Sequence, residues 1–397
     1  MEILLIQPKA NWEKNYCESP SIALLTLGAI AKELGHHVKV YHMDIDPLDV
    51  EEEVKDYDII GISTNTFQVK SARAVAKTAR ETNPDIKIVV GGPHALVWDG
   101  EADEIVVGEG ENKWLKILGE TREYADIDDI PLPDYSMVDM NRFCGVSPYG
   151  AIPSTVIFAS RGCPGKCIFC NSPSFWGSKV RYRSPKKVVD QIEMLHRKYG
   201  MREVFIQDDT FNANWPWAKD ILEGIIARGL NNEMVFKIDC RGNQSMVTEK
   251  FLDLAKEAGV WNIFIGVESG CQKMLDRMKK HVTVEEYKRA IRLIKDRGMK
   301  IQASFIIGLP GENWDTVAET QRFIDETNPW TLGYGYATPF PGTEFDEYVT
   351  EHDQKLPVDY GDYKYGTSIV RTDELDYDEL ASLRLYRKLC VREGVYA

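Results

Sequence analysis

Residues 155–170 read Thr155-Val-Ile-Phe-Ala-Ser-Arg-Gly-Cys163-Pro-Gly-Lys-Cys167-Ile-Phe-Cys170, an apolar run followed closely by three cysteines. The Cys-x3-Cys-x2-Cys spacing places three thiols in one loop, one fewer than a structural zinc site or a fully ligated 4Fe-4S cluster requires. On a 4Fe-4S cluster, three thiolates leave one iron free to bind a substrate or cofactor. A zinc site completed by a distant His or Cys, or three unrelated thiols, is the alternative.

The surroundings of the three cysteines favour the cluster. Gly162, Pro164 and Gly165 predict a loop whose backbone N–H groups approach a bound group closely. The apolar run Thr155–Phe158 is predicted to be the first strand of a β/α series, and such folds build their sites where strands end.

The composition is that of a soluble globular protein of two domains, with 397 residues, 43% hydrophobic and 28% charged. A net charge of −14 argues against nucleic-acid binding, which depends on clustered Lys and Arg. One basic run is expected to serve a cofactor loop and a helix start instead: Lys179, Arg181, Arg183, Lys186 and Lys187. No apolar run approaches the roughly 18 residues that span a bilayer, so we expect a cytoplasmic protein without a membrane span.

Five further cysteines show no pairing pattern and are expected to be buried or idle thiols, with no second cluster: Cys17, Cys144, Cys240, Cys271 and Cys390. A reducing compartment suits free thiols and an oxygen-sensitive cluster alike.

Residues 1–120 alternate short apolar runs with amphipathic segments, which predicts a flavodoxin-like, doubly wound parallel sheet. The expected strands are Ile3–Gln7, Val38–His42, Ile59–Ser63, Ile86–Val90 and Glu104–Val107, with helices at Ile22–Leu34 and Val69–Glu81. Ligands bind such sheets in loops beyond the strands' carboxyl ends. Here these loops are Ser63–Thr66, Gly91–His94 and Gly108–Glu111.

Residues 121–153 contain four prolines and little periodicity, so we interpret them as an ordered linker. In residues 154–343 we count six strand-like runs: Thr155–Phe158, Val204–Ile206, Val235–Ile238, Ile263–Gly266, Ile301–Ile307 and Leu332–Tyr336. Helical patterns follow all but the last, and Thr283 with Glu286 predicts a capping box before the helix Val284–Arg297. Six units are too few to close an eight-stranded barrel, so an open, partial barrel is expected.

The remaining residues, 344–397, are rich in Tyr and acids and are expected to form a C-terminal cap ending in a helix, Tyr377–Arg392. Polar or Gly/Pro-rich residues follow the barrel strands, at Asp208-Asp209, Arg241, Glu268-Ser269, Gly308–Gly311 and Ala337–Pro339. Each has an ordinary explanation as a turn, ion pair or cap. Their recurrence at one end of the strands indicates a site.

The barrel region resembles the radical S-adenosylmethionine (SAM) superfamily, whose signature is Cys-x3-Cys-x-aromatic-Cys. Here Phe169 supplies the aromatic residue between Cys167 and Cys170. The resemblance implies that Cys163, Cys167 and Cys170 hold a 4Fe-4S cluster whose open iron chelates SAM. Reductive cleavage of SAM then gives a 5′-deoxyadenosyl radical that abstracts a substrate hydrogen.

The same resemblance implies SAM contacts by position. Asp208 and Asp209 occupy the place of the motif that receives the SAM amino group, and which of the two does so is left open. Glu268, followed by Ser269, matches the ribose contact, and Arg241 lies where a cation meets the SAM carboxylate. The expected adenine contacts are Phe169, Ile307, Gly308, Pro310 and Ala337.

Residues 1–120 resemble the cobalamin-binding domain of one radical SAM subgroup. The matching segments are Pro20–Leu24, Ser63–Thr66, Gly91–His94 and Gly108–Gly110. The implied cobalamin contacts are Ser63, Thr64, Thr66, Gly91, Gly92, Pro93, Gly108, Glu109 and Gly110, because glycines admit the corrin and hydroxyls bond its amides. No Asp-x-His-x-x-Gly motif supplies a cobalt ligand, and His94 is expected to bond backbone rather than metal.

The function that these resemblances imply is cobalamin-dependent radical SAM methylation of an unactivated centre in a small-molecule or biosynthetic-intermediate substrate. An external donor such as flavodoxin or ferredoxin would supply electrons. Oxidative cyclisation, rearrangement, a degenerate cobalamin domain and a non-enzymatic iron–sulfur or corrinoid sensor are the alternatives. Methylthiolation of tRNA does not fit, because Cys17 is the only cysteine in residues 1–120.

Overall fold

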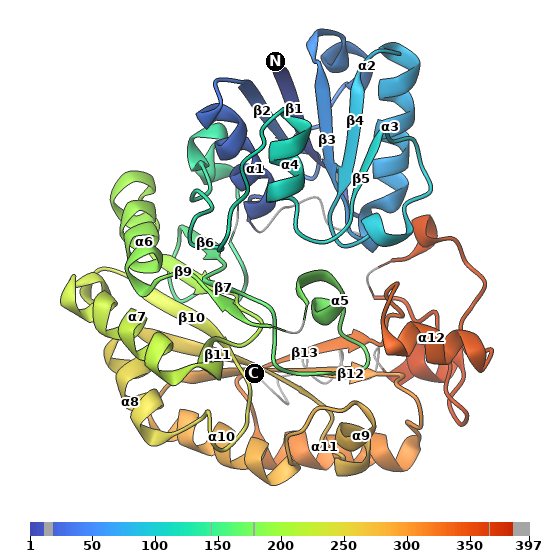
Figure 1. The fold of residues 1–397 in the computed structure, drawn as a ribbon. Helices are drawn as coiled ribbons and strands as arrows, with labels where there is room; N and C mark the ends of the chain where they lie inside the picture. Colours follow the sequence, from blue (N-terminus) through green and yellow to red (C-terminus); the bar gives the residue numbers. More distant parts are fainter. Residues whose placement is uncertain (12–18, 144, 178, 365, 384–397) are drawn as a thin grey trace. The chain divides into compact units, whose positions relative to one another are not determined.

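The computed structural model describes residues 1–11, 19–143, 145–177, 179–364 and 366–383 (Figure 1). The chain divides into two compact units. The first consists of Met1–Ser147, Ser174–Gly177 and Val358–Tyr365, and the second of Pro148–Pro173, Ser178–Pro357 and Gly366–Ala397. Cys17, Cys144 and Cys390 lie outside the described residues.

The first unit is built on a five-stranded parallel sheet of order β2-β1-β3-β4-β5, which is the flavodoxin-like arrangement expected from the sequence. Its strands are β1 (Glu2–Gln7), β2 (His37–His42), β3 (Ile59–Ser63), β4 (Lys87–Gly91) and β5 (Glu104–Val106). Its helices are α1 (Ile22–Glu33), α2 (Val50–Glu53), α3 (Val69–Thr82) and α4 (Glu111–Ile117). Short 3-10 turns are η1 (Val54–Asp56), η2 (Thr66–Gln68), η3 (Ala95–Val97), η4 (Tyr135–Met137), η5 (Met140–Arg142) and η8 (Tyr360–Asp362).

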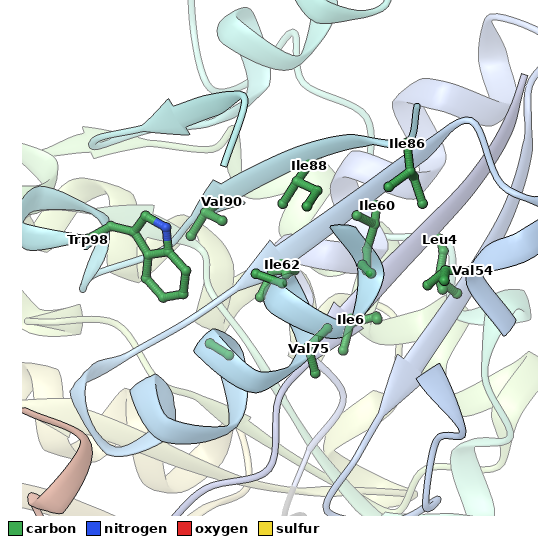
Figure 2. Packing of buried hydrophobic residues seen from close by; sticks show 13 residues of the cluster. Leu4, Ile6, Val54, Ile60, Ile62, Val75, Ile86, Ile88, Val90 and Trp98 are labelled. Carbon is green, nitrogen blue, oxygen red and sulfur yellow. The ribbon is translucent and has the colours of Figure 1, made fainter. Parts of the chain in front are cut away.

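Both faces of this sheet are covered, because alternate strand residues point to opposite sides. On one face, strand residues such as Ile6, Ile62 and Val90 pack against α3 residues such as Val75 (Figure 2). On the other face, Ile3, Leu5 and Val89 pack against residues of α1 and α4. Burial on two sides explains why the strands are nearly continuous runs of Ile, Leu and Val.

Residues 121–147 group with the first unit. Tyr135 and Met140 are 1% and 5% exposed, and Lys32 of α1 lies 2.5 Å from the carboxylate of Asp134. This part of the segment interpreted as a linker therefore packs as part of the first unit.

The second unit is built on a six-stranded, wholly parallel sheet of order β13-β12-β11-β10-β9-β6. Its strands are β6 (Ser154–Ile157), β9 (Glu203–Ile206), β10 (Val235–Cys240), β11 (Val260–Glu268), β12 (Lys300–Ile307) and β13 (Thr331–Tyr336). β6 and β13 are its edges, so the sheet stays open, and the predicted partial barrel is confirmed. A two-stranded antiparallel pair, β7 (Ser160–Arg161) and β8 (Arg181–Tyr182), brackets the cysteine loop and was not anticipated from the sequence.

The helices of the second unit follow its strands. They are α6 (Pro185–Tyr199), α7 (Trp215–Ala227), α8 (Glu249–Glu257), α9 (Gln272–Arg277), α10 (Val284–Asp296), α11 (Trp314–Thr327) and α12 (Glu344–Glu351), with the turns η6 (Phe211–Ala213) and η7 (Leu230–Asn232). The short helix α5 (Ser172–Trp176) is divided between the two units, because Ser174–Gly177 group with the first. The Thr283–Glu286 capping box before α10 is present as expected. Two helices, α9 and α10, follow β11, where the sequence indicated one.

The C-terminal segment divides between the units. Residues 358–365 group with the first and residues 366–383 with the second, where Leu375, Leu380 and Leu383 pack on Ile307 and Val317. Residues 377–383 of the expected helix Tyr377–Arg392 are helical, and the rest lies outside the described residues. Over the described ranges, no helix is both long and apolar enough to cross a bilayer.

Candidate functional site

The cysteine loop is held by its own backbone. Gly165 N–H donates to Cys163 Sγ and Ser172 N–H donates to Cys170 Sγ, each at 3.4 Å, and Cys170 N–H donates to the Cys167 carbonyl at 3.1 Å. The Cys163 Sγ lies 3.4 Å from the Thr210 hydroxyl, beyond β9. N–H groups directed at sulfur stabilise thiolate charge, as they do around iron–sulfur clusters.

The three thiols suit a cluster better than a single ion. All three cysteines are half-buried. Among the described residues, no three His, Cys, Asp or Glu side chains are placed to hold one metal ion. Thiols that each bind a different iron need not converge on one point, so the donor set fits a 4Fe-4S cluster with one open iron.

Asp208 and Asp209 follow β9 and have different environments. Asp208 is 1% exposed, and its carboxylate accepts hydrogen bonds from the Ala159 and Ser160 N–H groups at 2.7 and 3.0 Å. The Ser160 hydroxyl donates a third bond at 2.8 Å. Burial raises the pKa of Asp208 to about 7, although these bonds act to lower it. Asp209 is exposed and accepts a hydrogen bond from the Ser172 hydroxyl at 2.5 Å.

Arg241, which follows β10, packs onto the cysteine loop. A Cβ atom at Gly165 would lie 2.5 Å from Arg241 Nη1 and 3.4 Å from Cys163 Sγ, so only glycine lets the guanidinium pack here. Arg241 Nε donates to Asn243 Oδ1 at 3.2 Å, and Nη2 donates to the Lys280 carbonyl. The side chain expected to meet SAM is therefore directed at the cluster loop.

Glu268 ends β11 in a left-handed conformation, with φ of +68°. Its Oε1 accepts a hydrogen bond from Lys280 Nζ at 2.8 Å, and its Oε2 has a long contact of 3.5 Å with the Ser304 hydroxyl. Lys280 Nζ also lies 5.9 Å from the centre of the Phe169 ring. Burial acts to lower the pKa of Lys280, but the surrounding groups, with the Glu268 carboxylate first among them, together raise the pKa. This pair joins the end of β11 to the signature aromatic residue.

Ser269 follows Glu268 and is bonded to protein groups. It is 1% exposed, its hydroxyl lies 3.0 Å from the Thr320 hydroxyl, and it accepts from Cys271 N–H at 3.1 Å. Ile307 and Ala337 are 5% and 2% exposed, and Ala337 N–H donates to the Ile307 carbonyl at 2.8 Å. These residues shape the ends of β11, β12 and β13.

The loop Gly308–Glu312 is braced by two side chains. The buried Glu312 carboxylate accepts the Gly308 N–H, and Arg277 Nη1, at the end of α9, donates to the Pro310 carbonyl at 3.2 Å. Gly311 has φ of +79° and packs directly against the Arg277 guanidinium. Arg277 thus fixes the conformation of the loop expected to contact adenine.

In the first unit, the strand ends that carry the predicted cobalamin residues are adjacent. Ser63 pairs with Gly91 and Gly91 with Val106, so β3, β4 and β5 end side by side. Gly108, with φ of +79°, and Gly110 lead from β5 into α4, where Gly110 is the N-cap residue. Pro93 and the apolar residues Leu96 and Val107 are exposed at this edge.

The glycines at this edge differ in whether the fold itself requires glycine at the position. Gly92 has φ of +95°, and a Cβ there would lie 2.5 Å from the Thr64 carbonyl oxygen, so the fold itself requires glycine. A Cβ at Gly91 or Gly110 would meet nothing closer than 3.7 Å. Packing within the protein therefore does not require glycine at Gly91 or Gly110. The absence of side chains at these two positions leaves room for a flat ligand such as a corrin.

The hydroxyls and the histidines of this edge are engaged by the protein. Thr64 donates to the Asn65 carbonyl at 3.1 Å, and the Thr66 hydroxyl lies 3.2 Å from His94 Nδ1. The expectation that His94 bonds backbone is therefore wrong for its ring, although its N–H donates to the Thr64 carbonyl at 3.1 Å. His94 is fully buried and contacts the Tyr360 ring edge-on, and His42 Nε2 accepts the Ser21 N–H at 2.8 Å. His42 Nε2 is thus occupied by a protein donor, whereas His94 Nε2 is buried and has no hydrogen-bond partner among the described residues.

Two family models match separate regions of the chain. The family model for the radical SAM superfamily matches residues 157–324, and the model for the B12 binding domain matches residues 13–117. The chain thus contains a radical SAM domain and a B12-binding domain. Its cofactors are a 4Fe-4S cluster, SAM and cobalamin.

Two relatives illustrate the range of chemistry among proteins similar to this chain. The chain is 27% identical over 402 residues to an uncharacterized methyltransferase of Pyrococcus horikoshii, covering 92% of this chain and 86% of the relative. It is 30% identical over 362 residues to the anaerobic magnesium-protoporphyrin IX monomethyl ester cyclase of Rubrivivax gelatinosus, covering 81% of this chain and 63% of the cyclase. The chain thus spans less than two thirds of the cyclase.

Solved structures show the same fold. The radical SAM methyltransferase TsrM from Kitasatospora setae, with cobalamin and a [4Fe-4S] cluster bound, matches with a TM-score of 0.70 at 18% identity. This match covers 90% of this chain and 76% of TsrM. The cobalamin-dependent SAM radical enzyme OxsB matches with a TM-score of 0.65 at 18% identity, over 99% of this chain and 61% of OxsB.

Lys280 and Arg277 were missed by the sequence reasoning. Neither follows a strand directly, and each reaches the site from a helix end. Lys280 lies twelve residues after Glu268, and Arg277 contacts a loop more than thirty residues away. A sequence signal exists only for Lys280, as the second lysine of the Lys279-Lys280 pair before the capping box.

Proposed function

We propose that this protein is a cobalamin-dependent radical SAM methyltransferase acting on an unactivated centre of a small-molecule or biosynthetic-intermediate substrate. The observation that carries the proposal is the packing of the cysteine loop against three strand ends. Thr210 contacts Cys163, Arg241 packs on Gly165, and Lys280 links Phe169 to Glu268. When bound, the cluster supplies the electron that cleaves SAM and cobalamin carries the methyl group.

The chain's own residues would bind and orient SAM. Asp209 is the exposed carboxylate of the pair, so we assign it to the SAM ammonium. Asp208, at the end of β9, has a structural role, because it accepts hydrogen bonds from the Ala159 and Ser160 N–H groups just before the cysteine loop. Glu268 Oε2 would accept a hydrogen bond from a ribose hydroxyl, because Glu268 Oε1 already accepts one from Lys280. Ile307, Gly308, Pro310 and Ala337 would line the adenine, on a loop that Arg277 and Glu312 hold in place.

In the first unit, we assign the cobalamin site to the adjoining ends of β3, β4 and β5. Gly91 and Gly110 would face the corrin, and neither His42 nor His94 would ligate cobalt. We further propose a cytoplasmic location and an external low-potential donor such as a flavodoxin or ferredoxin.

Oxidative cyclisation is the second candidate, because the cyclase of Rubrivivax gelatinosus is 30% identical to this chain. Anaerobic protein loaded with both cofactors would be incubated with reductant and SAM labelled in its methyl group. A methyltransferase is expected to transfer the label to the protein-bound corrinoid, as seen by mass spectrometry. Unlabelled corrinoid, in protein that still forms 5′-deoxyadenosine, would favour cyclisation.

A further inference from the structure

Two cations, Arg241 and Lys280, lie against the cysteine loop, and their charges are balanced differently. Lys280 forms a 2.8 Å ion pair with Glu268, so its charge is largely offset. Arg241 donates to the amide oxygen of Asn243 and to the Lys280 carbonyl, and both acceptors are uncharged. The positive charge of Arg241 is therefore not neutralised by these two partners, and it can interact with the cysteine sulfurs of the loop.

The position of Arg241 places this charge over the centre of the loop. The guanidinium occupies the space that a side chain at Gly165 would fill, beside the Cys163 sulfur. Arginine stays protonated in proteins, so the guanidinium keeps its positive charge beside the Cys163 sulfur.

We propose that Arg241 sets the reduction potential of the bound cluster by stabilising its reduced form. The proposal rests on the proposed function, since it needs a 4Fe-4S cluster on the three cysteines. Reduction adds one electron from an external low-potential donor and makes the cluster more negative. A half-buried cation beside the Cys163 ligand favours that state, because net charge and hydrogen bonding around the sulfurs set cluster potentials.

This role differs from the SAM-carboxylate contact expected from the sequence. A residue that only binds SAM changes SAM affinity and leaves the SAM-free cluster unaffected. A residue that acts on the cluster shifts its potential in the absence of SAM. The two roles are therefore separated by measuring the potential before SAM is added.

The experiment is a redox titration of anaerobic, SAM-free protein with mediators, following the reduced cluster by paramagnetic resonance. Arg241→Gln removes the charge, and we expect the ratio of reduced to oxidised cluster at a fixed potential to fall at least tenfold. For one electron this corresponds to a potential about 59 mV lower. Arg241→Lys keeps the charge and is expected to retain most of the wild-type ratio.

Two further variants keep the test specific. Gly165→Ala displaces the guanidinium without changing any charged residue and is expected to lower the potential too. Arg289→Gln is the matched control and should leave the potential unchanged, because Arg289 lies on α10 and donates to the Val247 carbonyl. A wild-type potential in both Arg241→Gln and Gly165→Ala, with iron retained, would overturn the proposal. Wild-type protein that binds no cluster would overturn the proposed function itself.

Discussion

Lys280 Nζ lies 2.8 Å from Glu268 Oε1, and both side chains are about nine-tenths buried. A buried ion pair adds little net stability compared with apolar residues, but removing one partner leaves an uncompensated buried charge. Glu268 moreover has a left-handed backbone that costs energy in a non-glycine residue. A buried pair on a strained residue is typical of a functional site, where the surroundings maintain the strain.

We predict that Lys280→Met lowers the free energy of unfolding by about 3–5 kcal/mol, because the Glu268 carboxylate is left buried without its partner. Urea unfolding of the cluster-free protein measures this. The neighbouring Lys279 provides the matched control, since its pair with Glu344 is about half exposed. Lys279→Met should cost less than about 1 kcal/mol. Equal losses in the two variants would show that the buried pair has no special role.

We predict that Asp209→Asn weakens SAM binding by roughly 10- to 150-fold, the loss of one charge-assisted hydrogen bond worth about 1.5–3 kcal/mol. Equilibrium dialysis of cluster-loaded protein with SAM measures this. Asp208→Asn is the comparison, because its carboxylate already accepts three hydrogen bonds from Ala159 and Ser160. It should lower thermal stability more than SAM affinity. The reverse ranking of the two variants would reassign the SAM ammonium to Asp208.

Much of the fold could be predicted from the sequence, because its signals are local. Apolar runs such as Ile59–Ser63 and Ile301–Ile307 became buried parallel strands, and their ends differ from the predicted ends by three residues or fewer. The Thr283–Glu286 capping box depends on a spacing of three residues and was found as expected. The loop that carries the three cysteines was predictable for the same reason, because its motif depends only on the spacing of nearby residues.

The different roles of neighbouring site residues could not be predicted, because they depend on contacts with residues far away in the sequence. Asp208 and Asp209 are identical neighbours in sequence, and contacts with residues far away in the chain distinguish them. Ala159 and Ser160, almost fifty residues away, bond Asp208, and Ser172 bonds Asp209. Gly91 and Gly92 differ in the same way, since only Gly92 packs against the Thr64 backbone. The periodic pattern of apolar residues in the sequence carries no information about such contacts.

We predict that the first unit loses stability between pH 7 and pH 5 because of His42. Burial lowers the pKa of His42 from 6.5 to about 4, although the nearby Asp46 acts to raise it. The unfolded chain therefore binds the proton first, and the free energy of unfolding falls as pH drops below about 6.5. One pKa unit corresponds to about 1.4 kcal/mol.

The check is the pH dependence of urea unfolding in two histidine variants. His42→Gln should reduce the slope between pH 5 and pH 7 by about half, because burial also lowers the pKa of His94 to about 4 and that contribution remains. His37→Gln, at a side chain that is 81% exposed on the same strand, should leave the slope unchanged. Parallel slopes in wild type and His42→Gln would contradict the assignment.

We predict that Gly91→Leu abolishes cobalamin retention while leaving the fold and the cluster intact. A Cβ at Gly91 would make only an ordinary contact, 3.7 Å from the Val106 side chain, so a larger side chain here is expected to displace a bound corrin rather than the fold. Gly92 is unsuitable for this test, because a Cβ there would collide with the Thr64 backbone. Absorbance after reconstitution with hydroxocobalamin and gel filtration measures retention. Gly335→Leu, in an equally open position on β13, is the control, and equal retention in both variants would move the corrin site elsewhere.

The most direct test of the central claim is the formation of 5′-deoxyadenosine by the anaerobic, reconstituted protein with SAM and a strong reductant, quantified by chromatography and mass spectrometry. The wild-type protein, carrying about four iron and four sulfide per chain, is expected to release 5′-deoxyadenosine. The variant with alanine at Cys163, Cys167 and Cys170 is expected to lose the cluster and release none. A wild-type protein that holds the cluster and binds SAM without forming 5′-deoxyadenosine would contradict the account, and so would a triple variant that retains the cluster.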